Sequence, residues 1–146
     1  MLENMVKPTM THIKPEEALP FIRVYNDMFS TAVVDEKDVT KCVWLGFEVE
    51  GALRGVLGLQ PLADSVFVWG MFGDGSRSLA EYKVGVYMGR VVDGLPFDLS
   101  GAILPANVAQ KRRAERHGWT KADSMIMCGT NDELQELWTR PWKGKD

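Results

Sequence analysis

The sequence predicts one α/β (α+β) domain, residues 1–146, with a mixed, mostly antiparallel central sheet flanked by helices. Three strand-like runs follow one another closely, at 42–51, 52–62 and 65–72. Short turns with Gly or Ala-Asp separate them, which is typical of an antiparallel meander. A helical segment at 78–93 and a further strand-like run at 97–104 then predict a βαβ-like crossover. The composition, 45% apolar and 25% charged, is that of an ordinary globular domain.

A strand near 6–13 and an amphipathic helix within 14–30 are predicted before the meander. The helix begins near Pro15, and two acidic residues in its first turn suit the positive end of the helix dipole. Pro20 is either tolerated near the helix start or divides the helix in two. The charged segment 33–41 is predicted to be a connection. Helical spacing assigns the buried face of the helix to Ala18, Phe21, Ile22, Tyr25 and Phe29.

Glycines and a helix-capping pattern predict the features of the remaining elements. Gly55 and Gly58 predict a bulge or a close backbone approach in the second run of the meander. Ser78 and Glu81 have the spacing of a capping box at the start of the next helix. In that helix, Gly85 and Gly89 lie one turn apart and predict close packing on the sheet. A basic helix after residue 107, a strand at 124–129, a short closing helix at 132–138 and a tail from 139 complete the prediction.

Charge and cysteine content exclude several classes of protein. A net charge of −3 and a pI near 5.4 argue against nucleic-acid binding by the whole domain. Cys42 and Cys128 lie in apolar strand-like runs and are predicted to be buried free thiols. No signal peptide or membrane span is recognisable, so we expect a cytoplasmic protein without membrane contact. The histidines, His12 and His117, have no metal-ligand spacing, and no metal site is predicted.

The segment 73–77, GDGSR, lies between an apolar strand and a helix start and has two interpretations. Gly73 and Gly75 permit tight turns that leave amide N–H groups free for phosphate oxygens, beside a helix N-terminus and Arg77. Asp74 would repel a phosphate unless it points outward. The segment is therefore either an ordinary turn or a phosphate cradle; it is neither a Walker loop nor a full dinucleotide fingerprint.

A positive strip is the main feature of the basic helix. It is either a solvated face partly paired with Glu115 or a contact surface for an anionic ligand or partner. Nucleic acid is the weaker of these partners, because aromatic residues do not interleave with the cations. The strip consists of Lys111, Arg112, Arg113 and Arg116, with Lys121 beyond them.

Two segments together resemble the GCN5-related N-acetyltransferase (GNAT) superfamily. The run NVAQKRRAERHGW, from Asn107 to Trp119, has the family's Asn, helix and Gly-aromatic ending. Its AERHGW ending is similar to the branch that acetylates ribosomal proteins and other N-termini. The run GMFGDG keeps two loop glycines, with Gly70 where the family has Arg or Gln. The resemblance implies a GNAT-like sheet and acetyl-CoA-dependent acetyl transfer to an amine, on a protein N-terminus or a small molecule.

The resemblance also implies positions for the cofactor and the chemistry. The 73–77 loop would hold the coenzyme A pyrophosphate, and Asn107 would brace a splayed strand beside the pantetheine. Ala114 stands where many members have a Tyr that protonates the leaving thiolate. Glu48 and His117 are the candidate catalytic residues, and each is alternatively structural. The implied cofactor-binding residues are Val68, Gly70, Phe72, Gly73, Asp74, Gly75, Ser76, Arg77 and Asn107.

Departures from the family pattern sustain a noncatalytic alternative. Gln110, Arg113 and His117 stand where aliphatic residues are commoner in the family. The chain is also similar to small GNAT-like virion proteins of tailed bacteriophages, which have eroded coenzyme loops. In this alternative it is a structural or interaction protein of a virion. Trp138 and Trp142 near the C-terminus would then meet a partner protein or a second copy. A nucleic-acid-binding module that uses the basic helix is a third hypothesis.

Overall fold

The computed structural model describes residues 7–29, 34–128 and 133–144. The mixed, mostly antiparallel sheet with helices on its faces is confirmed. The elements in chain order are β1 (Thr9–Ile13), α2 (Pro15–Met28), the 3-10 helix η1 (Glu36–Lys41), β2 (Val43–Val49), β3 (Ala52–Pro61), β4 (Val66–Gly73), α3 (Leu79–Asp93), β5 (Leu99–Ile103), α4 (Val108–Arg116), β6 (Thr120–Cys128) and β7 (Glu133–Arg140).

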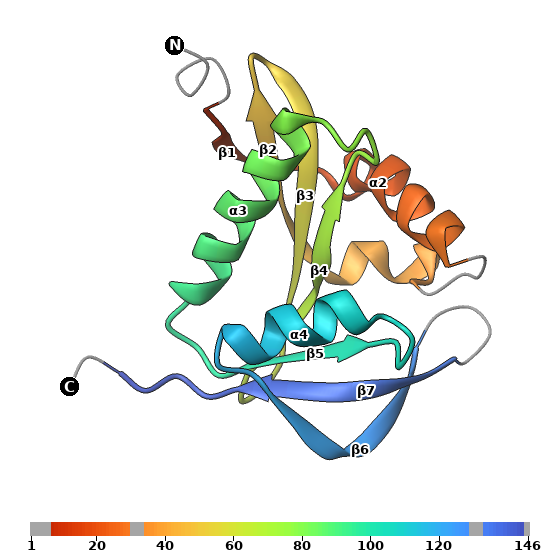
Figure 1. Ribbon diagram of the computed structural model, residues 1–146, viewed down its shortest axis with the longest axis vertical. Coiled ribbons are helices and arrows are strands. Elements are labelled where there is room, and N and C mark those ends of the chain that lie inside the picture. Colours follow the sequence, from red (N-terminus) through yellow and green to blue (C-terminus); the bar gives the residue numbers. More distant parts are fainter. Residues whose placement is uncertain (1–6, 30–33, 129–132, 145–146) are drawn as a thin grey trace.

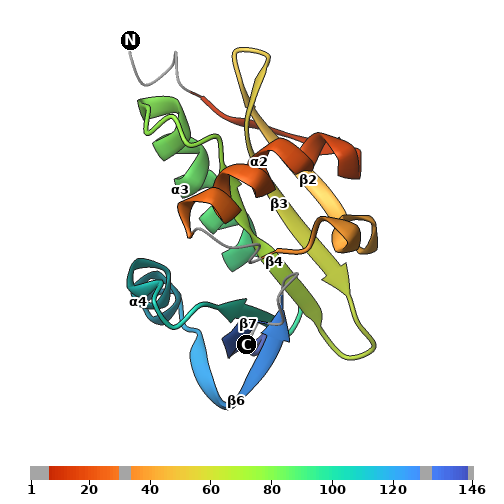
Figure 2. The same cartoon turned by 90° about the vertical axis from the view of Figure 1, so that its right-hand side faces the viewer.

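One sheet of seven strands organises the described chain, in the order β1-β2-β3-β4-β5-β7-β6. Among its pairs only β4 and β5 run parallel, and α3 is the crossover between them, as predicted. Helices α2 and α3 lie on either side of the strands, and α4 lies close to β5 (Figure 1; Figure 2).

Apolar side chains on the two faces of the sheet form separate parts of the core. On the α2 face, Ile22 packs in a cluster with Trp44 and Phe72. On the α3 face, Val84 packs in a cluster with Phe47. Helix α2 continues through Pro20. Of the five residues predicted to be buried, Ala18, Phe21 and Ile22 are buried, whereas Tyr25 and Phe29 are half-buried.

The strands β4 and β5 separate after a short paired stretch. They are paired only over 66–68 and 99–101, so the rest of β4 has no β5 neighbour. In the β3–β4 pair, Gly58 faces Gly70 and Leu59 faces Val68, so Trp69 is the extra residue of a bulge. Gly70 has φ +147°, a conformation that favours glycine, which explains the glycine at this position. The bulge opposite Gly58 thus lies on β4, and the second run of the meander has its own bulge at Arg54, because Phe47 faces Gly55 and Glu48 faces Leu53.

The C-terminal prediction of a short helix at 132–138 is wrong, because Glu133–Arg140 forms β7 between β5 and β6. Residue 132 itself lies outside the described residues, and the predicted tail begins after Arg140 rather than at 139. The buried residues of β7 include Gln135, Glu136 and Arg140, which are polar. The hydrophobic alternation of a strand is therefore missing from its sequence, and tertiary pairing overrides its helical propensity.

Smaller predictions have mixed outcomes. Segment 33–41 is not only a connection, since Glu36–Lys41 forms η1. The last predicted strand, 124–129, begins earlier, at Thr120. Cys42 is buried and free, as predicted, whereas the side chain of Cys128 lies outside the described residues. No helix in the described part of the chain is long and apolar enough to cross a membrane.

Candidate functional site

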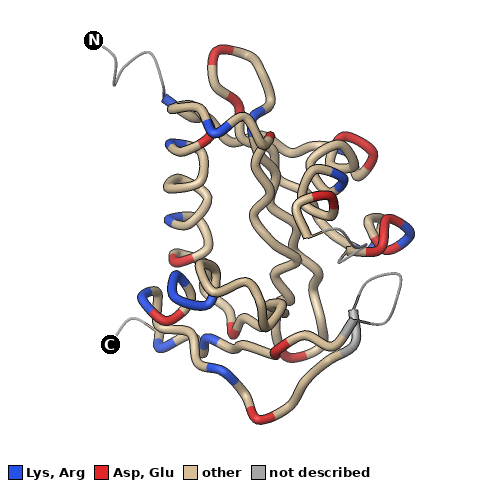
Figure 3. The backbone as a smooth tube through the Cα atoms, turned by 45° about the vertical axis from the view of Figure 1, so that its right-hand side comes forward, with Lys and Arg blue, Asp and Glu red and all other residues tan. Residues whose placement is uncertain are grey.

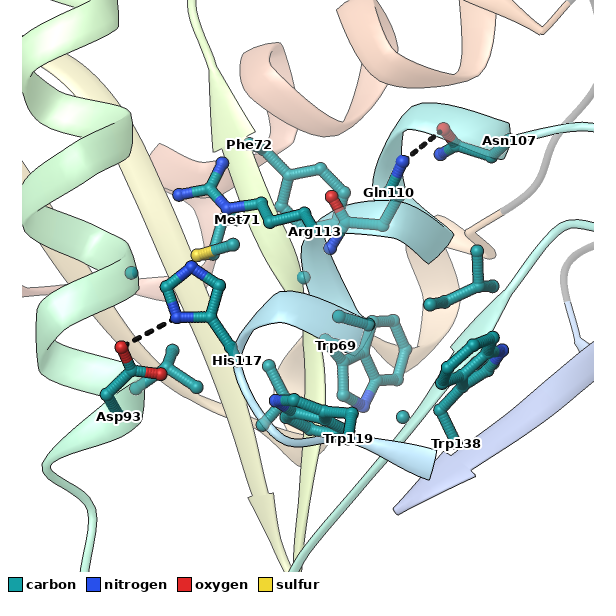
Figure 4. A pocket seen from close by; sticks show the side chains of 18 of the residues that line it. Trp69, Met71, Phe72, Asp93, Asn107, Gln110, Arg113, His117, Trp119 and Trp138 are labelled. Atoms are coloured by element: carbon teal, nitrogen blue, oxygen red, sulfur yellow. Dashed lines mark hydrogen bonds and ion pairs between the residues drawn. The ribbon is translucent and has the colours of Figure 1, made fainter. Parts of the chain in front are cut away.

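A cavity of about 100 Å³ opens where β4 and β5 separate. We call it the splay cavity. Its lining comes from β4, β5, α4, β7, the end of α3 and Tyr25 of α2, and it includes Gly101 and Ala114. Figure 4 shows its residues Trp69, Asn107, Trp119 and Trp138. Of the residues implied to bind the cofactor, Val68, Gly70, Phe72 and Asn107 lie here. Gly70 is therefore a strand residue at the β4 bulge rather than a loop residue.

A second, more open hollow of about 600 Å³ lies between α3 and α4. We call it the α3–α4 groove. Its basic lining residues are Arg77, Arg113 and Arg116, and its acidic one is Glu81. Arg113 and His117 line both the groove and the splay cavity, so these two side chains separate the two spaces.

Arg113 joins α4 to α3. Its Nη2 donates a hydrogen bond of 2.8 Å to the carbonyl oxygen of Gly85. A Cβ on Gly89 would lie 2.8 Å from the same nitrogen, so the glycine makes room for the guanidinium. Burial, with Arg116 nearby, lowers the pKa of Arg113. The prediction that Gly85 and Gly89 allow packing on the sheet is therefore wrong, because Gly89 makes room for Arg113 of α4 and a Cβ on Gly85 would contact none of the described residues.

His117 makes the second link between α4 and α3. Its Nδ1 lies 2.7 Å from Oδ2 of Asp93, the last residue of α3 (Figure 4). Such a carboxylate holds the imidazole in one orientation and favours a proton on Nδ1. The other ring nitrogen, Nε2, then has its lone pair available to accept a proton. The sequence offered no signal for Asp93, because the two residues meet only in the folded chain.

The 74–78 loop differs from the expected phosphate cradle. Its backbone amides are not free. The Gly75 N–H donates to Oε2 of Glu81 at 2.5 Å, and the backbone N–H of Arg77 donates to Oε1 of Glu81 at 2.9 Å. Arg77 has φ +55°, in the left-handed region that non-glycine residues rarely adopt. Ser78 caps α3 by accepting the Glu81 amide at 3.1 Å, so half of the predicted capping box is confirmed. The Glu81 carboxylate, however, binds the loop instead of the Ser78 amide.

Asp74 turns back onto its own loop. Its Oδ1 accepts the Ser76 amide at 2.9 Å, and its Oδ2 pairs with Arg54 Nη1 of β3 at 3.1 Å. Burial is the largest influence on the Asp74 pKa and raises it, but the hydrogen bonds from Ser76 and Arg54 together hold it below its usual value. Its charge is therefore partly neutralised within the chain.

Asn107 forms the N-cap of α4, where its Oδ1 accepts the Gln110 amide at 3.2 Å (Figure 4). Its side chain also forms a hydrogen bond with Tyr25 of α2, which partly offsets the rise that burial causes in the Tyr25 pKa. Asn107 thus connects α2 with α4 beside the splay cavity.

Other predicted residues lie elsewhere. Glu48 is on β2 opposite Thr9 and lines neither the splay cavity nor the α3–α4 groove. His12 is exposed on β1, consistent with a surface role. Trp138 is buried, with its indole N–H donating to Glu136, so its predicted exposure to a partner is wrong. Trp142 remains partly exposed, with its ring 5.8 Å from the Arg140 guanidinium.

The basic strip of α4 is divided between two environments. Lys111 pairs with the buried Glu136 at 3.4 Å, and none of the ion pairs among the described residues involves Glu115, the partner in the first of the two alternatives. Arg113 and Arg116 face the α3–α4 groove, and Arg112 is exposed. The cations of α4 gather at the end of the molecule where this helix meets α3 (Figure 3). The described residues bring together no group of three His, Cys, Asp or Glu side chains suited to a metal ion.

Comparison with known proteins gives a consistent picture of the fold. No family model matches the chain, and no curated protein matches its sequence. The ribosomal-protein-S18-alanine N-acetyltransferase of Escherichia coli matches with a TM-score of 0.62 at 10% identity, over 96% of this chain and 97% of that one. A GNAT-family acetyltransferase of Bacillus cereus ATCC 10987 matches at 0.60 and 8%, over 92% and 97%. The PaiA N-acetyltransferase of Thermoplasma acidophilum, in complex with coenzyme A, matches at 0.61 and 8%, over 93% and 99%. The chain therefore has the fold of the GNAT superfamily.

Proposed function

We propose that the chain is an N-acyltransferase that moves an acetyl group from acetyl-CoA to an amine. The observation that carries this proposal is the splay cavity, which adjoins the basic α3–α4 groove at Arg113 and His117. A long ligand with an anionic part and a reactive end needs two such adjoining spaces. One GNAT-fold neighbour, PaiA, is itself a complex with coenzyme A.

The residues around the groove fit an anionic group. The Gly75 and Arg77 amides converge on one carboxylate, and the same convergence suits a phosphate oxygen. Arg77, Arg113 and Arg116 line the groove beside them and favour negative charge. The fit requires the Glu81 carboxylate to leave the two amides, since one anion occupies them at a time.

Acetyl-CoA supplies an activated thioester when it is bound. On the protein side, the bulge at Trp69 and Gly70 leaves part of β4 without a β5 partner beside the splay cavity. His117, oriented by Asp93, is the residue that we assign to proton transfer, because Nε2 is left to accept a proton from the attacking amine. As the C–S bond of the thioester breaks, the same proton passes to the departing thiolate, so that free coenzyme A and the acetylated amine are the products.

Calorimetric titration with coenzyme A and acetyl-CoA tests the proposal. We expect micromolar dissociation constants that weaken at least tenfold when Arg113 and Arg116 are both changed to Ala. Arg23→Ala is the matched control, because Arg23 pairs with Glu36 on the far side of α2. Absence of binding at millimolar ligand would refute the proposal. Where binding is found, release of free thiol with a panel of amines measures the transfer.

A noncatalytic structural or interaction role is the second candidate, and a specific observation favours it. The amides of Gly75, Ser76 and Arg77 are already satisfied by Glu81 and Asp74. Arg113 and His117 also link α3 to α4 at the boundary between the splay cavity and the α3–α4 groove. Failure of both coenzyme forms to bind, with the chain folded, would favour this role.

A further inference from the structure

Glu81 occupies the position in the α3–α4 groove that an external anion would need. Both of its carboxylate oxygens accept backbone N–H groups of the 74–78 loop, from Gly75 and from Arg77. The side chain comes from the first turn of α3 and folds back over the loop rather than capping its own helix. The chain thus supplies its own anion to this pair of amides.

The shape of the loop is adapted to this carboxylate. A Cβ on Gly73 would collide with the Glu81 carboxylate, so the absence of a side chain there leaves room for it. Gly75 has φ +78°, and a Cβ on it would lie 2.8 Å from Val24 of α2. Gly73 therefore leaves room for the Glu81 carboxylate, and Gly75 lets the loop approach Val24 while its backbone amide donates to Glu81.

The surroundings of Glu81 carry positive charge that remains available. Among the ion pairs of residues 7–29, 34–128 and 133–144, none involves Arg77 or Arg116. Both arginines line the same groove as Glu81. A second anion entering the groove would meet these cations, but it would be repelled by Glu81 and would find the two amides occupied.

We propose that Glu81 competes with the pyrophosphate of coenzyme A for the Gly75 and Arg77 amides and thereby limits the affinity of the chain for the cofactor. The inference rests on the proposed function and assigns Glu81 as the residue that sets cofactor affinity at that site. Binding exchanges one carboxylate for one phosphate at the same donors, so the affinity reports the difference between the two interactions. Removing the internal carboxylate removes the competition.

The test compares Glu81→Gln and Glu81→Ala with the wild type by calorimetry, using coenzyme A and inorganic pyrophosphate as separate ligands. We expect both variants to bind both ligands at least tenfold more tightly. A tenfold change equals about 1.4 kcal/mol, which is less than two charge-assisted hydrogen bonds are worth together. Glu115→Gln is the matched control: it makes the same charge change on the exposed face of α4, and we expect less than a twofold effect.

The outcomes separate this inference from the proposed function. If the wild type binds coenzyme A and the Glu81 variants bind it no more tightly, the inference is overturned while the proposed function stands. If no form binds coenzyme A at millimolar concentration, the proposed function fails, and pyrophosphate binding still reports on Glu81. Tighter coenzyme A binding without tighter pyrophosphate binding overturns the inference as well. So does loss of the native circular dichroism spectrum in both variants, because Glu81 would then be required for folding.

Discussion

Replacing Arg140 by Met is expected to destabilise the end of α3. Arg140 is only 8% exposed, and its guanidinium donates to the carbonyl oxygens of Val92, Asp93, Leu95 and Phe97 at 2.8–3.2 Å. These carbonyls belong to the last turn of α3 and the chain that leaves it. Burial lowers the pKa of Arg140, but an arginine still carries its charge at neutral pH.

The loss in the free energy of unfolding depends on which backbone carbonyls are left without a hydrogen-bond donor. A cation at a partly buried helix C-terminus contributes up to about 2 kcal/mol. The Val92 oxygen keeps the Leu95 amide as a donor, and the chain around Phe97 is exposed enough to meet water. The backbone carbonyl oxygen of Asp93 loses its charged hydrogen-bond donor, at a cost of about 1–2 kcal/mol. Met fills the volume of the arginine stem, so the total loss is about 3 kcal/mol.

Urea unfolding at pH 7, followed by circular dichroism, measures this loss. Arg140→Lys keeps the charge but reaches fewer carbonyls, so we expect about half the effect. Arg90→Met is the matched control, since Arg90 is an exposed arginine in the same last turn of α3, and its loss is expected below about 0.5 kcal/mol. If Arg140→Met costs less than about 1 kcal/mol, or no more than Arg90→Met, the capping role is refuted.

Three further predictions follow from local contacts. Gly85→Ala and Gly89→Ala each gain about 1 kcal/mol of helix propensity, but only the Cβ at Gly89 displaces Arg113. Thermal melts should therefore show that the Gly85→Ala variant is the more stable of the two. Equal stabilisation by the two changes would contradict this. Burial raises the pKa of Cys42 from 9.0 to about 12, so its contribution to stability is complete below pH 9 and is lost as the pH rises towards 12. In a Cys128→Ala background, the free energy of unfolding in urea should be lower at pH 10.5 than at pH 7, and Cys42→Ala should abolish this difference. If the difference is unchanged in Cys42→Ala, the loss does not come from Cys42. The Asp74 pKa is lowered, so its contribution is present at neutral pH and disappears as the pH falls through that pKa. Asp74→Asn should therefore lose less stability than the wild type between pH 7 and 3, and an equal loss argues against it.

Local sequence patterns predicted the strands and α-helices from β1 to α4, though not the 3-10 helix η1, because each has a nearby marker. Ser78 begins α3 by capping it, and apolar runs bounded by turns define β2 to β4. The strand β7 has no such marker, since its buried positions include Glu136 and Arg140. Those residues are satisfied by Lys111 of α4 and by carbonyls at the end of α3, which are distant in sequence. No local pattern records such partners.

The candidate site was predictable in position but not in detail. The loop glycines and Asn107 identified the two regions that the fold brings together. The partner of His117 was not visible, because Asp93 lies at the end of a different helix. Glu81 was recognised for its spacing from Ser78, but the loop conformation, with Arg77 at positive φ, decides where its carboxylate goes. That conformation depends on tertiary packing against Val24 and Arg54.

The place of β7 between β5 and β6 has a consequence for the order of folding. β6 precedes β7 in the chain, and among the described residues it reaches the rest of the sheet only through β7. During synthesis, β6 and the free edge of β5 must therefore wait unpaired until Arg140 has left the ribosome. Unpaired strand edges promote aggregation, and late non-local pairing slows folding. We therefore expect chains that end before Glu133 to associate through these edges, even though their first four strands and α3 are complete.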